Sequence, residues 1–166
     1  QLVAAMTPCR CGWRGHPSGR CTCSAREVER YVEKISGPLL DRIDLHVNVP
    51  SVEYEAIRRR APAESSAAVK ARVEAARSIQ KKRFAGTAVT CNAAMTPEMV
   101  GRFCPLDEAG EALMKSAFSR MGLTARSHDR ILRLARTIAD LEGAADIGPG
   151  HLAEAIQYRN TDILQG

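Results

Sequence analysis

The chain has 166 residues, of which 45% are hydrophobic and only 4% are aromatic, and its formal net charge is +5. This length suits one domain or two small ones, and a core with few aromatic side chains favours helices rich in Ala, Leu, Ile and Val. The charge permits a polyanionic partner but is too small to indicate DNA binding by itself, and no apolar run reaches the ~20 residues of a membrane span.

The first fifty residues predict two strands separated by a cysteine-rich loop and a helix. Residues 1–6 are an apolar run that fits a buried strand, and residues 8–23 form a loop rich in glycine. Ser24 and Glu27 have the spacing of a capping box and open a helix, which should stop at Gly37-Pro38. Alternation then predicts a second strand with one face formed by Ile43, Leu45, Val47 and Val49.

The rest of the chain predicts only helices. A long basic helix, capped by Ser65 or Ser66, should end near Phe84. Later helices should begin at the capping residues Thr96, Asp107 and Thr124 and at Pro149. Two strands cannot bury a core alone, so the chain either dimerises through them or is a fragment of a larger α/β domain. We expect the latter, because Gln1 already lies in the first predicted strand.

The six cysteines fall into one cluster and two isolated residues. Cys9-x-Cys11 and Cys21-x-Cys23 place four thiols in a short polar loop, as suits a structural zinc site. Metal binding would supply the folding free energy that such a loop lacks. His16 could replace one ligand, and the alternative is four free or disulfide-bonded thiols. Such cysteine usage favours a reduced compartment, and the isolated Cys91 and Cys104 are both expected to be inert core residues.

A single arginine lies between two aspartates in the segment GPLLDRIDL. Arg42 would ordinarily form a local ion pair with Asp41 or Asp44. However, this segment resembles the arginine-finger segment of AAA+ ATPases from the magnesium-chelatase branch. The blocks LVAAMTPCRCG, ISGPLLDRIDLHV, VEAARSIQKKRF, LTARSHDRILRLARTIADLEG and HLAEAIQYR follow one another as in the ComM (YifB) family of magnesium-chelatase-like proteins.

This resemblance covers residues 2–159 and implies a fold and a function. Full-length members resemble hexameric, cytoplasmic rings that use ATP and Mg²⁺ to drive DNA branch migration during natural transformation. The chain would be mainly α: the end of an AAA+ α/β core at residues 1–50 with its four-cysteine loop, a linker and basic helix at 51–85, and a helical lid at 86–166. It contains no G-x-x-x-x-G-K-[ST] motif and no apolar run ending in Asp-Glu. The fragment alone should therefore not hydrolyse ATP.

The resemblance also assigns roles to individual residues. Thr7 occupies the position at the end of the first strand where the family usually has an Asn that orients the attacking water. Arg42 matches the arginine finger that reaches the nucleotide of a neighbouring subunit. Arg126 matches the ATP-contacting arginine in the first turn of a lid helix, and Arg130, one turn later, is the second choice.

Two other functions remain open at this point. The first is a stand-alone, zinc-containing adaptor that binds nucleic acid or a protein, and the second is a magnesium chelatase subunit. The paired Cys-x-Cys motifs argue against the chelatase, because they belong to the ComM-like pattern. Basic residues gather between positions 58 and 83, including three arginines at 58–60, but glutamates interrupt them and no aromatic ladder accompanies them. We expect this segment to be a solvated helix that links core and lid.

Overall fold

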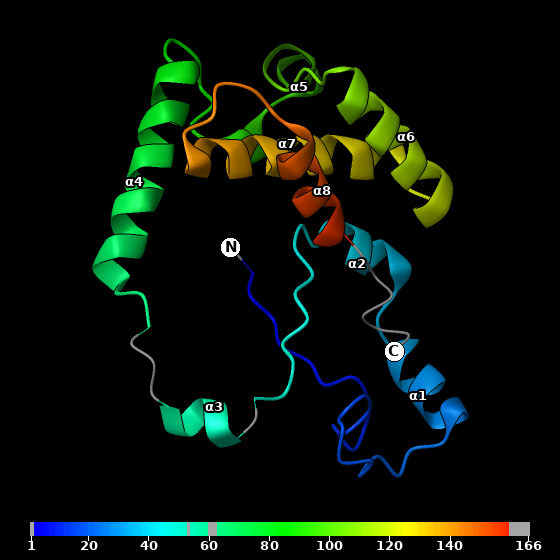
Figure 1. The fold of residues 1–166 in the computed structure, drawn as a ribbon. Helices are drawn as coiled ribbons and strands as arrows, with labels where there is room; N and C mark the ends of the chain where they lie inside the picture. Colours follow the sequence, from blue (N-terminus) through cyan, green and yellow to red (C-terminus); the bar gives the residue numbers. More distant parts are fainter. Residues whose placement is uncertain (1, 53, 60–62, 160–166) are drawn as a thin grey trace. The chain divides into compact units, whose positions relative to one another are not determined.

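The computed structural model describes residues 2–52, 54–59 and 63–159. Gln1 of the first predicted strand, Arg60 of the basic segment and residues 160–166 of the predicted lid lie outside the described residues. The chain divides into two compact units, with the division between residues 59 and 60. Over the described ranges it contains eight α-helices, one short 3-10 helix and no strand (Figure 1). The prediction of a mainly helical chain is confirmed.

The first unit contains the cysteine loop and three helices, α1 (Ala25–Val32), α2 (Gly37–Arg42) and α3 (Tyr54–Arg59). Helix α1 begins at the predicted capping box. The Ser24 N–H donates to Glu27 Oε2 over 2.8 Å, and the Glu27 N–H donates to Ser24 Oγ over 3.3 Å. Both bonds satisfy backbone donors that a helix start would otherwise leave unpaired.

The two predicted strands do not form in the described part of the chain. Residues 2–7 and 43–49 lack regular secondary structure, and their apolar side chains are exposed apart from the partly buried Ile43; Val3 and Val49 are 84% and 81% exposed. A strand needs neighbouring strands to take up its backbone hydrogen bonds and to cover its apolar face. Neither segment has such a neighbour among the described residues, so the alternating pattern alone does not produce a strand.

Helix α2 was not predicted, and it changes the setting of Arg42. The structure begins a helix at Gly37-Pro38 instead of ending one there, because the Ser36 side chain accepts a hydrogen bond from the Leu39 N–H and Pro38 fits the first turn. Arg42 therefore lies in the last turn of a short helix and not at the start of a strand. The run LLDRI satisfies both patterns, and the serine cap decides between them.

The second unit is a helical bundle centred on α7 (Ala125–Glu142). Helix α7 packs against α4 (Ser66–Arg83), α5 (Pro97–Phe103), α8 (Pro149–Gln157) and the 3-10 helix Asn92–Ala94. Helix α6 (Glu108–Met121) packs against α8 (Figure 1). The side chains at the centre of this core include Phe84, Met114, Ile131, Ala135 and Leu152.

Helix ends in this unit follow the predicted local signals. The side chains of Ser65, Thr96, Asp107 and Thr124 each accept a hydrogen bond from a backbone N–H in the first turn that follows. Gly122 and Gly143 end their helices in the left-handed conformation, with φ of 58° and 73°. Glycine reaches this conformation without the cost that a Cβ would add, so it can close the helix with a final backbone hydrogen bond.

A buried polar cluster fastens α4 to α7. Asp140 is fully buried and accepts hydrogen bonds from Arg83 Nη1 at 2.7 Å, Asn92 Nδ2 at 2.8 Å and Arg136 Nε at 3.1 Å. Arg136 also donates to the carbonyl oxygens of Ala144 and Ala145, which follow α7. The basic helix α4 is therefore joined to this bundle by a charged residue, Arg83, as well as by the buried side chain of Phe84.

Among the described residues, no helix is both long enough and apolar enough to cross a bilayer.

Candidate functional site: the cysteine cluster and the arginines

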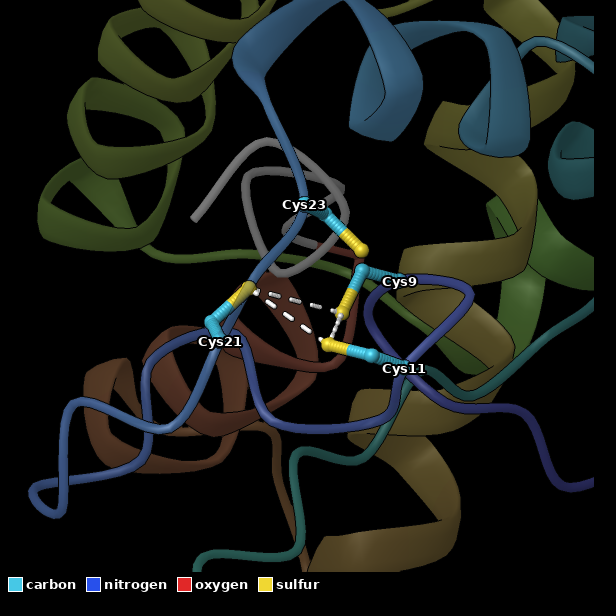
Figure 2. Close-up of side chains that lie close together, drawn as sticks. All are labelled: Cys9, Cys11, Cys21 and Cys23. Atoms are coloured by element: carbon cyan, nitrogen blue, oxygen red, sulfur yellow. Dashed lines mark hydrogen bonds between the residues drawn. The ribbon is translucent and has the colours of Figure 1, made fainter.

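The four clustered cysteines converge in space. The sulfur atoms of Cys9, Cys11, Cys21 and Cys23 all lie within 4.8 Å of one another (Figure 2). Individual separations are 3.4 Å for Cys9–Cys11, 3.9 Å for Cys9–Cys21 and 3.6 Å for Cys11–Cys21. These distances far exceed a sulfur–sulfur bond of about 2.05 Å, and all four thiols are free. The disulfide alternative is therefore absent from this structure.

The backbone of the loop brings the two cysteine pairs together. The Gly12 N–H donates to the Cys9 carbonyl oxygen over 3.1 Å, which closes a tight turn around the first two cysteines. Gly12 has a φ of 81°, a conformation that a residue with a Cβ rarely adopts. Cys9 is fully buried while the other three are partly exposed, so the cluster lies at the surface of its unit.

The geometry fits a tetrahedral metal ion. With metal–sulfur bonds of about 2.3 Å, the sulfur atoms of a tetrahedron are about 3.8 Å apart, close to the separations found here. His16, the alternative ligand, is not part of the cluster. Its Nδ1 accepts a hydrogen bond from the Ser18 N–H over 3.0 Å, and its ring packs edge-on against Trp13. The four thiols therefore form a complete candidate metal site without histidine.

The four thiols do not lose their protons equally. Backbone N–H groups of Trp13 and Thr22 donate to the Cys11 sulfur and lower its pKa to about 6. The pKa of Cys23 rises to about 11: a hydrogen bond from the Cys11 backbone lowers it, but the Cys11 side chain, burial and the negative charge of Cys11 outweigh that bond. Four thiolates this close repel one another, and a bound cation removes that cost.

Thr7 lies against the cysteine loop. Its hydroxyl donates to the Cys9 carbonyl oxygen over 3.0 Å and lies 3.1 Å from the Tyr31 hydroxyl on α1. Because the single Thr7 proton goes to Cys9, the Tyr31 hydroxyl is the donor in the second bond. No local sequence signal predicts the contact with Tyr31, because the two residues are 24 positions apart along the chain.

The three candidate arginines fall in different settings. Arg42 is exposed at the end of α2. Arg126 is exposed in the first turn of α7, and Arg130 is partly buried one turn later. The two α7 arginines are four residues apart and share one face of the helix, whereas Arg42 and Thr7 belong to the other unit.

Sequence reasoning missed a buried arginine beside the start of α7. Arg159 follows α8 and is only 6% exposed, and its Nη2 donates to Ser127 Oγ over 3.4 Å. Ser127 is itself buried, and its N–H donates to the Thr124 cap. Arg159 thus braces the turn that presents Arg126. No local signal distinguishes it, since its partner is 32 residues away along the chain.

Comparisons with known proteins cover both units of the chain. The profile described as "Magnesium chelatase, subunit ChlI C-terminal" matches residues 63–159, and "Magnesium chelatase, subunit ChlI" matches residues 1–57. The first of these alone spans more than half of the chain.

Curated relatives match almost the whole chain. It is 37% identical to "Competence protein ComM" of Haemophilus influenzae over 96% of its length and 38% identical to "Uncharacterized protein YifB" of Escherichia coli over 99%. It is 35% identical to an uncharacterised Mycobacterium tuberculosis protein over 97%. The chain spans about 30% of the length of these relatives. These matches show that the chain belongs to the magnesium chelatase subunit ChlI family, in the group of ComM- and YifB-like proteins.

Proposed function

We propose that the chain is the sensor, arginine-finger and lid portion of a ComM-like AAA+ ATPase that moves DNA branch points in the cytoplasm during transformation or recombination. The observation that carries this proposal is the 37% identity to a competence protein over 96% of the chain. In this proposal, residues 1–50 end the ATPase core, 51–85 link it to the lid, and 86–166 form the lid. The whole protein binds ATP, Mg²⁺ and DNA and assembles as a hexameric ring.

Arg42 acts in this proposal as a finger toward the nucleotide of the adjacent subunit. Its exposure at the end of α2 supports the assignment, because a finger must leave its own subunit to reach a phosphate. Such an arginine neutralises the charge that develops on the transferred phosphoryl group, and it contributes about 10³–10⁵ in rate in other nucleotidases.

Arg126 acts as the lid residue that contacts the nucleotide in its own subunit, with Arg130 as the alternative. Thr7 acts as the water-orienting sensor. Its hydroxyl proton is committed to the Cys9 carbonyl, so this role requires the hydroxyl to rotate when the nucleotide binds.

We also propose that the cysteine cluster holds one structural zinc ion through Cys9, Cys11, Cys21 and Cys23. Their sulfur separations and complete thiolate set support zinc, which prefers closed tetrahedral sulfur sites. The ion would fix the loop fold and would take no part in catalysis, since such a site leaves no coordination position for water.

The decisive experiment measures ATP hydrolysis and branch migration by the full-length protein with Arg42→Ala. ATP binding and the melting temperature should stay nearly unchanged, while hydrolysis falls by about 10³-fold or more. Mixing this variant with subunits that lack the phosphate-loop lysine should restore part of the activity. A large drop in melting temperature would instead make Arg42 a structural residue. If the full-length protein inserted magnesium into a porphyrin and did not move DNA junctions, that result would support the chelatase alternative.

A further inference from the structure

The cysteine loop is strongly basic. The first acidic residue of the chain is Glu27, and the preceding residues carry four arginines, at positions 10, 14, 20 and 26. Arg10 and Arg20 are exposed. Glu27, whose charge acts on Arg10, offsets at most one of these four charges, and its carboxylate also accepts hydrogen bonds from the Ser24 N–H and Ser24 Oγ, both over 2.8 Å. The loop therefore presents cations with no free carboxylate of its own.

The only tryptophan of the chain lies in the same loop. Trp13 is 38% exposed, the Arg20 guanidinium carbon lies 5.2 Å from its ring centroid, and the His16 ring packs edge-on at 4.9 Å. The Arg20 guanidinium and the His16 ring hold this large apolar ring at the surface. Such a ring is a platform on which another flat ring can stack. Trp13, Arg10 and Arg20 are each within two residues of a cluster cysteine, so the cluster fixes their backbone positions.

A bound metal ion would reduce this positive charge but would not reverse it. Four thiolates and one divalent cation together carry two negative charges, and any argument about the loop must include them. Three of the four arginines lie in the loop of residues 8–23, and their three positive charges still leave it with a net positive charge. The zinc cluster would thus act as a rigid frame whose rim is basic and aromatic.

We propose that this rim binds single-stranded nucleic acid, with a base stacked on Trp13 and phosphates bound by Arg10 and Arg20. Stacking requires an unpaired base, which a duplex does not expose, and cationic side chains beside an aromatic platform are the usual single-strand arrangement. An acidic peptide would satisfy the arginines but would leave the indole unused. This proposal rests on the proposed function, because a ring that moves DNA branch points separates and rejoins strands and so exposes single-stranded DNA.

The basic face of α4 is the competing surface. Lys81, Lys82 and Arg77 are exposed there, but Arg72 is paired with Glu64 at 2.7 Å, and Lys70 lies 3.7 Å from Glu74. Helix α4 contains no aromatic residue on which a base could stack. It can contribute charge but no platform, which makes it a matched comparison surface for the test.

The test uses the 166-residue chain loaded with zinc and a thymidine oligonucleotide of about 12 nucleotides, within the usual range of single-strand site sizes. Trp13 is the only tryptophan, so base stacking should quench the indole fluorescence saturably. An abasic oligonucleotide of equal length should bind roughly 5- to 150-fold more weakly, the equivalent of one stacked base. Trp13→Ala should show the same loss with the normal oligonucleotide, and Trp13→Phe should restore most of the affinity.

Charge variants separate the two basic surfaces. Arg10→Gln with Arg20→Gln should lower the slope of log K against log salt by about 1.4, the value for two single-strand phosphate contacts. Lys81→Gln with Lys82→Gln removes the same charge from α4 and should leave the slope unchanged. Zinc content and circular dichroism verify that every variant is folded.

Three results would overturn the proposal. The abasic strand could bind as tightly as the normal oligonucleotide, or Trp13→Ala could bind as tightly as the unmodified chain. The slope of log K against log salt could also fall only in the α4 variant. Equal binding of polyglutamate would also overturn the proposal, because that result would show a general polyanion contact. These outcomes are independent of the proposed ATPase, since the binding assay uses neither ATP nor the remainder of the ring. Conversely, the full-length protein could fail to move DNA branch points while its loop still binds single strands. That result would reject the proposed function but not the proposal for the loop.

Discussion

The carboxylate of Asp140 holds together three elements at the scale of a single residue. Its oxygen atoms accept hydrogen bonds from Arg83 on α4, Asn92 in the 3-10 helix and Arg136 on α7. Asp140→Asn should lower the free energy of unfolding by about 3–5 kcal/mol, because the buried guanidinium of Arg136 and the partly buried one of Arg83 lose their counter-charge. Urea denaturation followed by circular dichroism measures the loss. Glu74→Gln, at an exposed ion pair with Lys70, is the matched control and should change stability by less than about 1 kcal/mol.

The same carboxylate predicts how stability depends on pH. Burial raises the pKa of Asp140, but hydrogen bonds from Arg83 and Asn92 and the charges of Arg83 and Arg136 outweigh burial, so its pKa lies below the usual value. A carboxyl whose pKa is depressed in the folded state stabilises the protein fully above its unfolded pKa of about 3.9. That stabilisation is lost as pH falls through the lower, folded pKa. Stability measured between pH 7 and 2 should fall less steeply in Asp140→Asn, and an unchanged curve would contradict the assignment.

Two isolated cysteines should differ in reactivity. Burial raises the pKa of Cys104 to about 11, so about one molecule in a thousand is a thiolate at pH 8. Burial also raises the pKa of Cys91, but hydrogen bonds from Arg77 and from the backbone of Ala94 and Ala93, together with the charge of Arg77, outweigh burial and lower the pKa. Cys91 also lines a hollow of about 260 Å³ beside α4. Alkylation followed by mass spectrometry should label Cys91 first and leave Cys104 unmodified until the protein unfolds. Equal labelling of both thiols in the folded protein would contradict this prediction.

At the scale of elements, helices could be predicted and strands could not. The caps at Ser24, Thr96 and Thr124 act within three residues of themselves, so the sequence contains their whole cause. A strand is stabilised by neighbours that the local pattern does not include, and the run from Ile43 to Val49 alternates correctly yet remains irregular. Helix α2 shows the converse: a serine cap and a proline start a helix inside a strand-like pattern.

The start of α8 offers a test of capping by histidine. The Gly148 N–H donates to His151 Nδ1 over 2.9 Å, and His151 Nε2 lies 2.9 Å from Glu142 Oε2. The amide can only donate, so Nδ1 is the acceptor and Nε2–H donates to Glu142. His151→Leu should cost about 1 kcal/mol in unfolding free energy, whereas His151→Gln can still reach the Gly148 N–H and should cost less. Equal losses in thermal denaturation of the two variants would show that packing, not capping, is responsible.

At the scale of the whole molecule, the convergence of the four cysteines could be predicted because they are close in sequence. Thirteen residues separate Cys9 from Cys23, so a short loop can bring all four cysteines together whatever surrounds it. The setting of Arg42 and the brace between Arg159 and Ser127 could not be predicted, because they depend on a competing cap and on a distant partner.

The division into two units predicts that metal removal has a local effect. Four-thiolate zinc supplies folding free energy only to the unit that contains it. Elemental analysis of protein purified under reducing conditions should find about one zinc per chain. A chelator should then collapse hydrogen-exchange protection around the cysteine loop and α1, while α7 and α8 keep theirs. Protein without metal, or loss of protection throughout the bundle, would contradict this prediction.

The Asp140 cluster has a consequence for the order of folding events. Arg83 and Asp140 are 57 residues apart in sequence, so their ion pair must wait until the long intervening segment has closed. Helices α7 and α8 are neighbours along the chain and can dock much earlier. In the folding transition state, the contacts between α7 and α8 should therefore be formed, whereas the contacts of α4 should not yet be formed. In stopped-flow kinetics, Asp140→Asn should accelerate unfolding and leave the refolding rate almost unchanged, whereas truncating Leu152 should slow refolding.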